Sequence, residues 1–329
     1  MADVRGTLTR VLGYAETAFK TPGAEAFVLP LTQFTPQPRQ PRIQSQTLTG
    51  RRGTTRSAAG LKSVEGQWSY EVAPESVGIV LRHLVGNPTT TGASAPYTHV
   101  FQHAISGANA LPPGLTLEQD FGAGTIAAAA RILRMLGCRI NQGTLTLTPQ
   151  GFQTMNLDIL GSDWLQATTP LDATPTDVGH TGFEAPNVSI TIGSPAREIC
   201  LNQLTLTIGN DLDPDKYCIT GGGVRDGLVE GFAMVSGQIT AFFDHEDVIN
   251  TVLSGADTSM TITISRGTGL GTAGNESLVI AIPALVFEAA GAPINGPRGQ
   301  RIQANFMAHR VGAAELGITY TLKNAVATY

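Results

Sequence analysis

Two short runs of metal-binding residue types are the first places in this sequence where chemistry could occur. His99-x-x-x-His103 has a spacing that two ligands of one metal ion can use on a helix. Residues 97–101 predict a strand instead, which separates the two rings, and no acidic residue or cysteine stands nearby. The second run is Asp211-x-Asp213-x-Asp215.

The three aspartates resemble the opening of a calcium-binding loop. Such loops need glycine at the sixth position and glutamate at the twelfth, where this sequence has Lys216 and Gly222. A polar turn is therefore the stronger interpretation, and the sequence predicts no metal site.

No arrangement typical of an enzyme active site is found either. Gly267-x-Gly269-x-Gly271 could cradle a phosphate, but it lies between two predicted strands, which indicates a hairpin turn. No Gly-x-Ser-x-Gly elbow occurs, and the six histidines are scattered. We therefore expect neither catalysis nor a cofactor.

Charge is distributed unevenly between two loops. The segment 39–62 carries six cations and no acid, and the segment 211–230 carries five acids against two cations. Two solvated loops are one interpretation. The other is that the basic segment of one subunit contacts the acidic segment of another and sets their register. The candidate contact residues are Arg42, Arg51, Arg52, Arg56, Asp211, Asp213, Asp215 and Asp226.

Strands and turns must position these segments. Residues 64–72 alternate between apolar and polar side chains, which predicts a strand with one buried face. Pro74 then marks the start of a short amphipathic helix that stops before Gly86. The same order recurs after Val235, where an alternating strand and a short helix end at Gly255.

The recurrence predicts a duplicated domain. Gly66 to Gly86 spans 20 positions and Gly237 to Gly255 spans 18. We expect a first domain at residues 1–165 with a loop-rich insertion at about 87–124, a linker at 166–186, and a second domain at 187–329. The linker is rich in Thr, Pro, Asp and Gly and shows no periodicity.

Composition narrows the classes of function further. The 329 residues carry a formal net charge of −5, and 14% are charged. A protein that binds nucleic acid through its phosphates is therefore not expected, because such binding needs clustered Lys and Arg. No run of 18 apolar residues occurs, so no membrane-spanning helix is expected. Three cysteines cannot all pair within one chain, which favours free thiols in a protein made in a reducing cytosol.

Several blocks together resemble the tail tube proteins of long-tailed bacteriophages. The blocks are Gly13–Pro22 (GYAETAFKTP), Val64–Glu71 (VEGQWSYE), Gly137–Asn141 (GCRIN) and the ending Leu322–Tyr329 (LKNAVATY). The resemblance implies a mostly β fold, a β-sandwich or half-barrel with one short flanking helix, present here as two copies. It also implies a structural virion protein of the tail, assembled in the host cytoplasm.

The resemblance further implies partners and a mode of assembly. Members stack as rings into a hollow tube that conducts viral DNA without binding its sequence. With a duplicated chain we expect homotrimeric rings of pseudo-sixfold symmetry, and homohexameric rings are the alternative. Tape-measure, tail-terminator and baseplate proteins are implied partners. A tail-completion or baseplate ring component and a host-binding β-sandwich module remain alternative functions.

Overall fold

The chain folds mainly into antiparallel β-structure. The computed structural model describes residues 6–329 except 105–106, 123–130, 194–195, 243–245, 292, 294–298 and 312–316, and it describes only the backbone of 246–249. Two α-helices are described, α1 (Val77–Leu84) and α2 (Glu246–Ser254). The strands of the first half are β1 (Arg10–Ala18), β2 (Thr21–Leu29), β3 (Gln33–Phe34), β4 (Gln37–Arg39), β5 (Arg42–Ile43), β6 (Ala58–Ala59), β7 (Ser63–Glu71), β8 (Thr89–Thr91), β9 (Tyr97–Gln102), β10 (Leu115–Asp120), β11 (Ile132–Leu147), β12 (Thr154–Gly161) and β13 (Asp163–Ala167). Those of the second half are β14 (Val188–Ile192), β15 (Arg197–Glu198), β16 (Leu201–Gly209), β17 (Met234–Phe242), β18 (Thr258–Ser265), β19 (Ser277–Phe287), β20 (Arg301–Ala308) and β21 (Thr319–Asn324).

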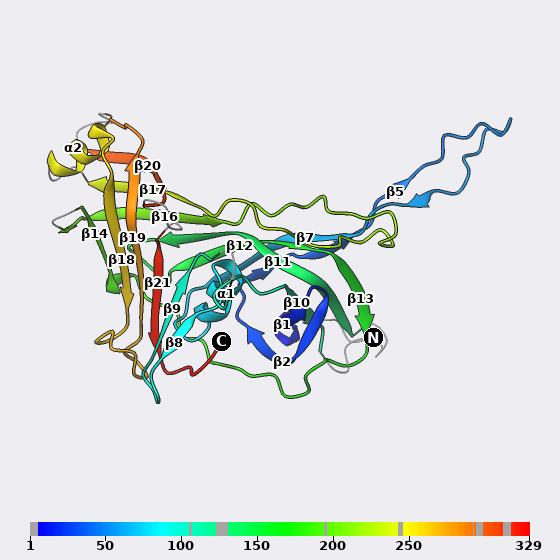
Figure 1. Cartoon of the computed structure of the whole chain (residues 1–329), viewed down its shortest axis with the longest axis horizontal. Coiled ribbons are helices and arrows are strands. Elements are labelled where there is room, and N and C mark those ends of the chain that lie inside the picture. Colours follow the sequence, from blue (N-terminus) through cyan, green and yellow to red (C-terminus); the bar gives the residue numbers. More distant parts are fainter. Residues whose placement is uncertain are drawn as a thin grey trace.

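A wide sheet contains strands from both halves of the chain. Its order is β4 and β3 beside β7, then β12, β11, β16, β17 and β20, with every neighbouring pair antiparallel. The pairing of β11 with β16 joins the first half to the second. Figure 1 shows these strands running together along the long axis of the molecule.

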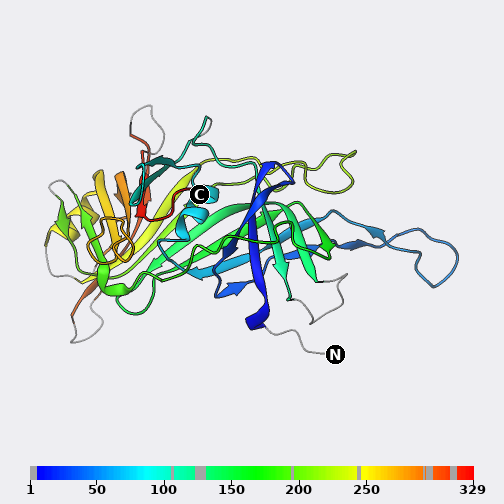
Figure 2. The same cartoon turned by 90° about the horizontal axis from the view of Figure 1, so that it is seen from below.

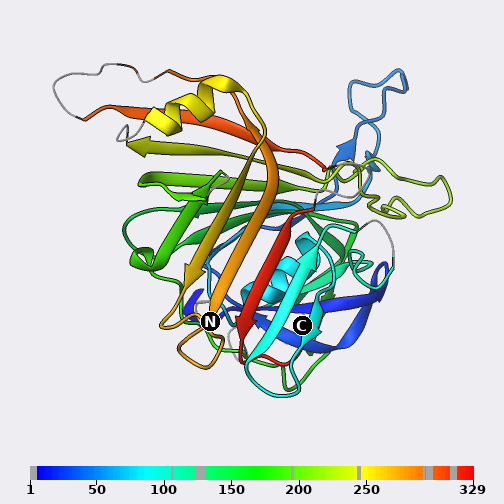
Figure 3. The same ribbon diagram turned by 60° about the vertical axis from the view of Figure 1, so that its left-hand side comes forward.

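Two further groups of strands extend from the wide sheet through long, bent strands. The first half of β11 pairs with β10 and β13, and β10 continues to β1 and β2. In the second half of the chain, β19 pairs with β18 and β21 before its end reaches β20. β18 continues to β14, and β21 continues to β9 and β8. In Figures 1 and 3 the β18, β19 and β21 group runs across the direction of β11 and β12.

Alternating side chains explain how these sheets enclose one core. Trp68 and Tyr70 on β7 are buried while Gln67 is exposed, as the predicted strand over residues 64–72 requires. Most of the buried apolar residues form one continuous cluster that extends from Val11 to Leu322 and so includes both halves, while Leu12, Tyr14 and Ala26 form a small separate cluster. Burial of this kind supplies most of the free energy that favours folding.

The two predicted helices are confirmed. α1 buries almost all of its side chains under the wide sheet, where the side chain of Leu84 lies close to Gly143 of β11. Gly86 has φ +144° and follows α1, and Gly255 has φ +59° and follows α2. Both values lie where glycine is strongly favoured, so these residues end their helices as predicted.

The segment 87–124, expected to be loop-rich, carries three strands. β8 and β9 form a hairpin, and β9 pairs with β21 near the other end of the chain. β10 is a central strand between β1 and β11. The strand predicted at residues 97–101 is confirmed as part of β9, and β8 and β10 are strands that the sequence did not predict. No described helix has the length and apolar character needed to cross a membrane.

Candidate assembly site

The wide sheet presents one polar face to solvent. The face follows from strand alternation, because every second side chain of β7, β12, β11, β16, β17 and β20 points away from the core. We define this polar face by Gln67, Ser69, Gln142, Thr144, Thr146, Asn156, Asp158, Thr205, Thr207, Ser236, Gln238, Thr240, Gln303 and Asn305. Amides and hydroxyls dominate this set. Glu65, Glu71, Arg301 and the exposed Met307 lie on the same side of the sheet.

Side chains on the polar face bind one another across strands. Gln67 donates from Nε2 to Asp158 Oδ1 at 2.9 Å, and Gln238 donates to Asn305 Oδ1 at 2.8 Å. Gln303 donates in turn to Gln238 Oε1 at 2.6 Å. Period-two polar residues in the sequence indicated such a face, but only the strand order shows which strands share it.

The basic segment is a hairpin that projects from the body of the molecule. We call residues 39–62 the basic arm. Only Arg42↔Ala59 and Ile43↔Ala58 pair within it, and Figures 1 and 2 show it extending beyond the sheets. A two-stranded ribbon of this kind is marginal alone in water.

Ion pairs inside the subunit neutralise the two ends of the basic arm. Arg39 lies 3.4 Å from Glu65 Oε2, and Lys62 Nζ lies 2.8 Å from Asp163 Oδ1. Arg42, Arg51, Arg52 and Arg56 are exposed. The available positive charge is therefore concentrated in these four arginines.

The acidic segment lies beside the base of the basic arm. We call residues 211–230 the acidic arm. The N–H of Lys62 donates to Gly223 O at 2.7 Å, and Tyr217 Oη donates to Lys62 O at 3.1 Å. Asp211, Asp213, Asp215 and Asp226 are exposed. In the described part of the chain, no ion pair joins these aspartates to the four exposed arginines of the basic arm.

Arg225 fixes the acidic arm to the first half and was missed as a structural residue in the sequence. Its guanidinium is buried and donates to Gly161 O and Pro214 O, each at 2.7 Å, and it lies 3.4 Å from Glu65 Oε1. Burial of an arginine requires such partners. Its acceptors come from distant segments, so no local signal in the sequence reveals the role.

Both arms also expose large apolar side chains. Leu48 in the basic arm is 97% exposed, Ile219 in the acidic arm is fully exposed, and Phe232 just beyond it is 82% exposed. Single exposed apolar side chains are common on protein surfaces, so these three residues only add to the reason given by the charges. The two arms together therefore form a candidate contact surface.

The other candidate sites of the sequence have structural roles. His99 is buried and binds Thr90 Oγ1 at 2.8 Å and Val326 O at 2.9 Å, while His103 lies 3.3 Å from Tyr320 Oη. The Asp215 N–H donates to Asp213 Oδ1 at 2.9 Å, which is a polar turn. Among the described residues, no cluster of three His, Cys, Asp or Glu side chains could hold a metal ion.

The glycine-rich segment is the predicted hairpin turn. Ser265 at the end of β18 pairs with Ser277 at the start of β19, and the residues between them close the hairpin. Gly267, Gly269 and Gly271 have φ values of +54°, +70° and +97°. These values explain the glycines through backbone geometry.

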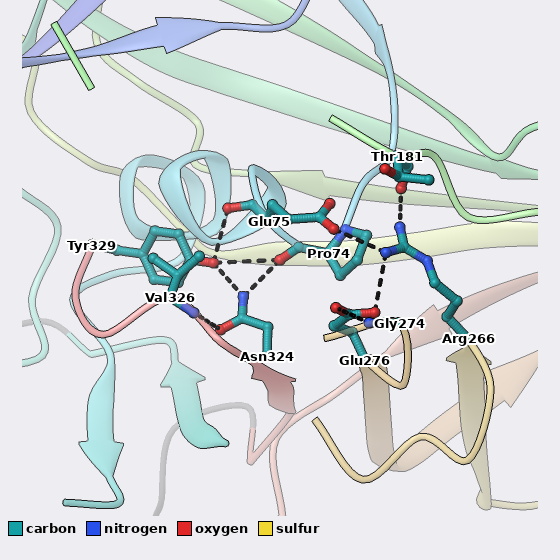
Figure 4. A network of polar contacts seen from close by, with 9 residues as sticks. All are labelled: Pro74, Glu75, Thr181, Arg266, Gly274, Glu276, Asn324, Val326 and Tyr329. Carbon is teal, nitrogen blue, oxygen red and sulfur yellow. Dashed lines mark hydrogen bonds and ion pairs between the residues drawn. The ribbon is translucent and has the colours of Figure 1, made fainter. Parts of the chain in front are cut away.

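A polar network attaches the end of the chain to the start of α1. Asn324 donates to Pro74 O at 2.7 Å and also contacts Tyr329 Oη, which donates to Glu75 O at 3.0 Å (Figure 4). Arg266 extends the network by binding Glu75 Oε1 at 2.9 Å and Glu276 Oε2 at 3.0 Å. The network holds strands β18, β19 and β21 of the second half against the helix of the first.

Comparison with known proteins gives one clear result. A family model described as "Phage tail tube protein" matches residues 6–308, which is nearly the whole chain. No curated protein matches the sequence.

Proposed function

Because the chain belongs to the phage tail tube protein family, we propose that it assembles into stacked rings that form the hollow tail tube and conduct DNA into the host. Membership of this family makes the protein a structural tail tube protein, a component of the virion assembled in the host cytoplasm. The ring we propose contains three chains, each with two equivalent units at 1–165 and 187–329 joined by the linker 166–186. Six units would then surround the lumen.

The matching order of strand pairs is the observation that carries this proposal. In the first half β1 pairs with β10, β10 with β11, β11 with β12 and β13, β12 with β7, and β7 with β4. In the second half β14 pairs with β18, β18 with β19, β19 with β20 and β21, β20 with β17, and β17 with β16. The two series correspond strand for strand, and α1 and α2 follow β7 and β17.

Irregular features recur at corresponding positions and support the same proposal. The β10–β11 pairing shifts register between Leu115 and Leu117, and the β18–β19 pairing shifts between Thr258 and Met260. Shifts of this kind are local features of a particular sheet rather than a general property of strands. The correspondence reduces the proposed insertion to residues 87–114, since β10 corresponds to β18.

Glycines provide a second correspondence. A Cβ at Gly66 would lie 2.5 Å from Thr35 O, and a Cβ at Gly237 would lie 2.2 Å from Thr205 O. Each glycine allows the backbone of the adjacent strand to approach closely. These matched close approaches favour two copies of one β-sandwich or half-barrel unit over two unrelated domains.

We place the polar face toward the lumen. A conduit for DNA needs a hydrated wall that does not hold phosphates, and strong binding to DNA depends on clustered Lys and Arg. The polar face offers amides and hydroxyls instead. Its continuity across β11 and β16 allows both units of a chain to contribute to one wall.

The arms are the proposed contacts between subunits. In a ring of alternating units, each acidic arm lies between the basic arm of its own chain and that of the next chain. The candidate residues are Arg42, Arg51, Arg52 and Arg56 on one side and Asp211, Asp213, Asp215 and Asp226 on the other. Opposite charges at such positions set orientation and suppress wrong contacts.

Reversal of charge in the basic arm tests this assignment. We expect Arg51→Glu, Arg52→Glu and Arg56→Glu together to block tube formation, because like charges would then face the acidic arm. The folded subunit should keep its melting temperature, since all three side chains are exposed. Electron microscopy and thermal denaturation measure the two effects.

A compensating variant is the control. Asp215→Arg and Asp226→Arg, added to the reversed arm, should restore tubes if the arms contact each other. Tubes of normal length from the triple variant alone would contradict the assignment.

Two alternative functions remain distinguishable by the form of assembly. A tail-completion or baseplate ring component would stop at one layer, whereas a tube protein forms long tubes of uniform bore. A host-binding module would bind a host surface component as a solitary subunit.

Homohexameric rings would contain six chains per layer instead of three. Tape-measure, terminator and baseplate proteins are the other partners we propose.

A further inference from the structure

The two halves of the chain are joined by an antiparallel strand pair. β11 and β16 pair from Gln142↔Gly209 to Leu147↔Leu204, which we call the internal seam. Thr144 and Thr207 lie opposite each other with their Oγ1 atoms 3.5 Å apart. Through the internal seam the wide sheet continues from one proposed unit into the other.

At one end of the wide sheet, β4 occupies the position in the first proposed unit that β16 occupies in the second. β4 corresponds to β16, because Gln37↔Glu65 occupies the position of Thr207↔Ser236. β16 has β17 on one edge and β11 on the other, whereas β3 and β4 pair only with β7 among the described strands. The outer edge of β3 and β4 therefore corresponds to the edge of β16 that pairs with β11, but it has no described partner strand.

At the opposite end of the wide sheet, the residues around Glu288 occupy the position in the second proposed unit that the seam-forming part of β11 occupies in the first. The Glu288 N–H donates to Asn305 O at 2.9 Å, so Glu288 occupies the position of Gln142, which pairs with Asp158. In the first half, the residues after Gln142 form the internal seam. In the second half, β19 ends at Phe287, and no described strand pairs with residues 289–291.

We infer, given the proposed ring, that these two edges pair between neighbouring copies in the register of the internal seam. The strands run antiparallel with Glu288 of one copy opposite Arg39 of the next. The further pairs are Ala289↔Pro38, Ala290↔Gln37 and Gly291↔Pro36. The closed wall would then contain three internal seams and three of these subunit seams.

Charge at the first pair supports this register. Arg39 and Glu288 lie on the same side of the sheet as the polar face, and both are exposed in the subunit. Arg39 now contacts Glu65 at 3.4 Å, and Glu288 accepts a hydrogen bond from Asn305 at 2.7 Å. Opposite charges placed directly across a strand pair stabilise it.

Prolines distinguish the subunit seam from the internal seam. The Thr35 N–H donates to Gln67 O at 2.8 Å, so the nitrogens of Phe34, Pro36 and Pro38 face the open edge by alternation. Proline has no N–H to donate. The N–H groups of Ala289 and Gly291 can donate to the carbonyls of Pro38 and Pro36. Pro38 and Pro36 cannot donate back to the carbonyls of Ala289 and Gly291, so each of these pairs has one hydrogen bond instead of two.

A strand pair with fewer hydrogen bonds suits an edge that stays exposed until the neighbouring subunit binds. Exposed strand edges pair with unrelated chains, and proline at an edge reduces that hazard. The internal seam forms when one chain folds and needs no such protection. We therefore attribute the asymmetry between the seams to the difference between folding and assembly.

Disulfide cross-linking tests the register. Gln37→Cys and Ala290→Cys are combined with Cys200→Ser and Cys218→Ser, which remove the two exposed native thiols. Positions 37 and 290 form a non-hydrogen-bonded pair in this register, where opposing Cα atoms are close enough for a disulfide. Assembled protein oxidised under mild conditions should give dimers and trimers on non-reducing gels, with the ladder ending at three chains.

Two controls define the outcome. Each single cysteine variant should remain uncross-linked, because the contact joins different edges of neighbouring copies. Gln37→Cys with Gly291→Cys should also fail, since residue 291 points to the opposite face of the sheet.

Three results would overturn the inferred register. One is tubes that form normally while the Gln37→Cys and Ala290→Cys variant gives no cross-link, which would leave the proposed tube function standing. Another is equal cross-linking of the Gly291→Cys control. A protein that stays monomeric under all assembly conditions would overturn the proposed function as well.

Discussion

Replacing Gly66 or Gly237 by alanine should destabilise the subunit by about 3 kcal/mol in each case. A Cβ at Gly66 would lie 2.4 Å from Pro36 N and 2.5 Å from Thr35 O. At Gly237 it would lie 2.2 Å from Thr205 O and 2.5 Å from the ring of Phe306. The closest obstacles are backbone atoms, between β3 and β4 for Gly66 and in β16 for Gly237, and backbone atoms cannot rotate away as a side chain can.

The two substitutions should differ in assembly. Gly66 supports the edge strands β3 and β4, so Gly66→Ala should also raise the protein concentration needed for tube formation. Gly237 supports β16 in the internal seam, and its substitution should act mainly through stability. Chemical denaturation and light scattering measure the two quantities.

Gly209→Ala is the matched control. It lies in β16, and a Cβ there would meet only Met234 O, at 3.9 Å. Little loss of stability is expected. If Gly66→Ala and Gly237→Ala were as mild as this control, the expected cost of the two close approaches would be wrong. A large loss at only one of the two glycines would contradict their equivalence.

Acidification from pH 7 to pH 4 should destabilise the folded subunit strongly. His83 and His103 are 7% and 8% exposed. Burial lowers the pKa of His83 to about 3, with help from the charges of Arg82 and Arg139, and burial lowers the pKa of His103 to about 4. An unfolded histidine titrates near pH 6.5.

The sign follows from proton binding. Below about pH 6.5 the unfolded chain takes up a proton on each histidine, while the folded chain does not until its lower pKa is reached. Stability is therefore full above pH 6.5 and falls through this window, by roughly 3 kcal/mol for each ring at pH 4.

Other buried groups do not reverse this trend. Burial raises the pKa of Glu16, so its protonation in the folded state opposes the loss. Burial also raises the pKa of Asp120, but hydrogen bonds from Arg131 and Gly122 outweigh it and leave that pKa lowered. The stability that Asp120 contributes is lost only at a pH below the histidine window.

Melting temperatures between pH 4 and pH 8 test the histidine prediction. The His83→Gln and His103→Gln double variant should show a shallower loss than the natural sequence. Its melting temperature at pH 8, where both rings are neutral, measures the loss of packing alone. An unchanged slope in the variant would assign the acid sensitivity to other groups.

The sequence predicts local structure well where burial imposes a period. The strand around Trp68 and the helix from Val77 to Leu84 were identified because one face of each must be apolar. The ends of both helices followed from glycine at Gly86 and Gly255.

Contacts between distant segments were not predictable. Nothing near Arg225 indicates that its acceptor is Gly161, and nothing near Tyr97 indicates that β9 pairs with β21. Such partners depend on the topology of the whole sheet. The charged arms were recognised from composition, but their shared base at Lys62 and Gly223 required the fold.

Electron microscopy of the purified, assembled protein tests the central claim most directly. End-on class averages should show a hollow tube with three chains per ring and six similar lobes around the lumen. Rings of six whole chains would contradict two equivalent ring units in one chain, and particles without a central channel would contradict the tube itself.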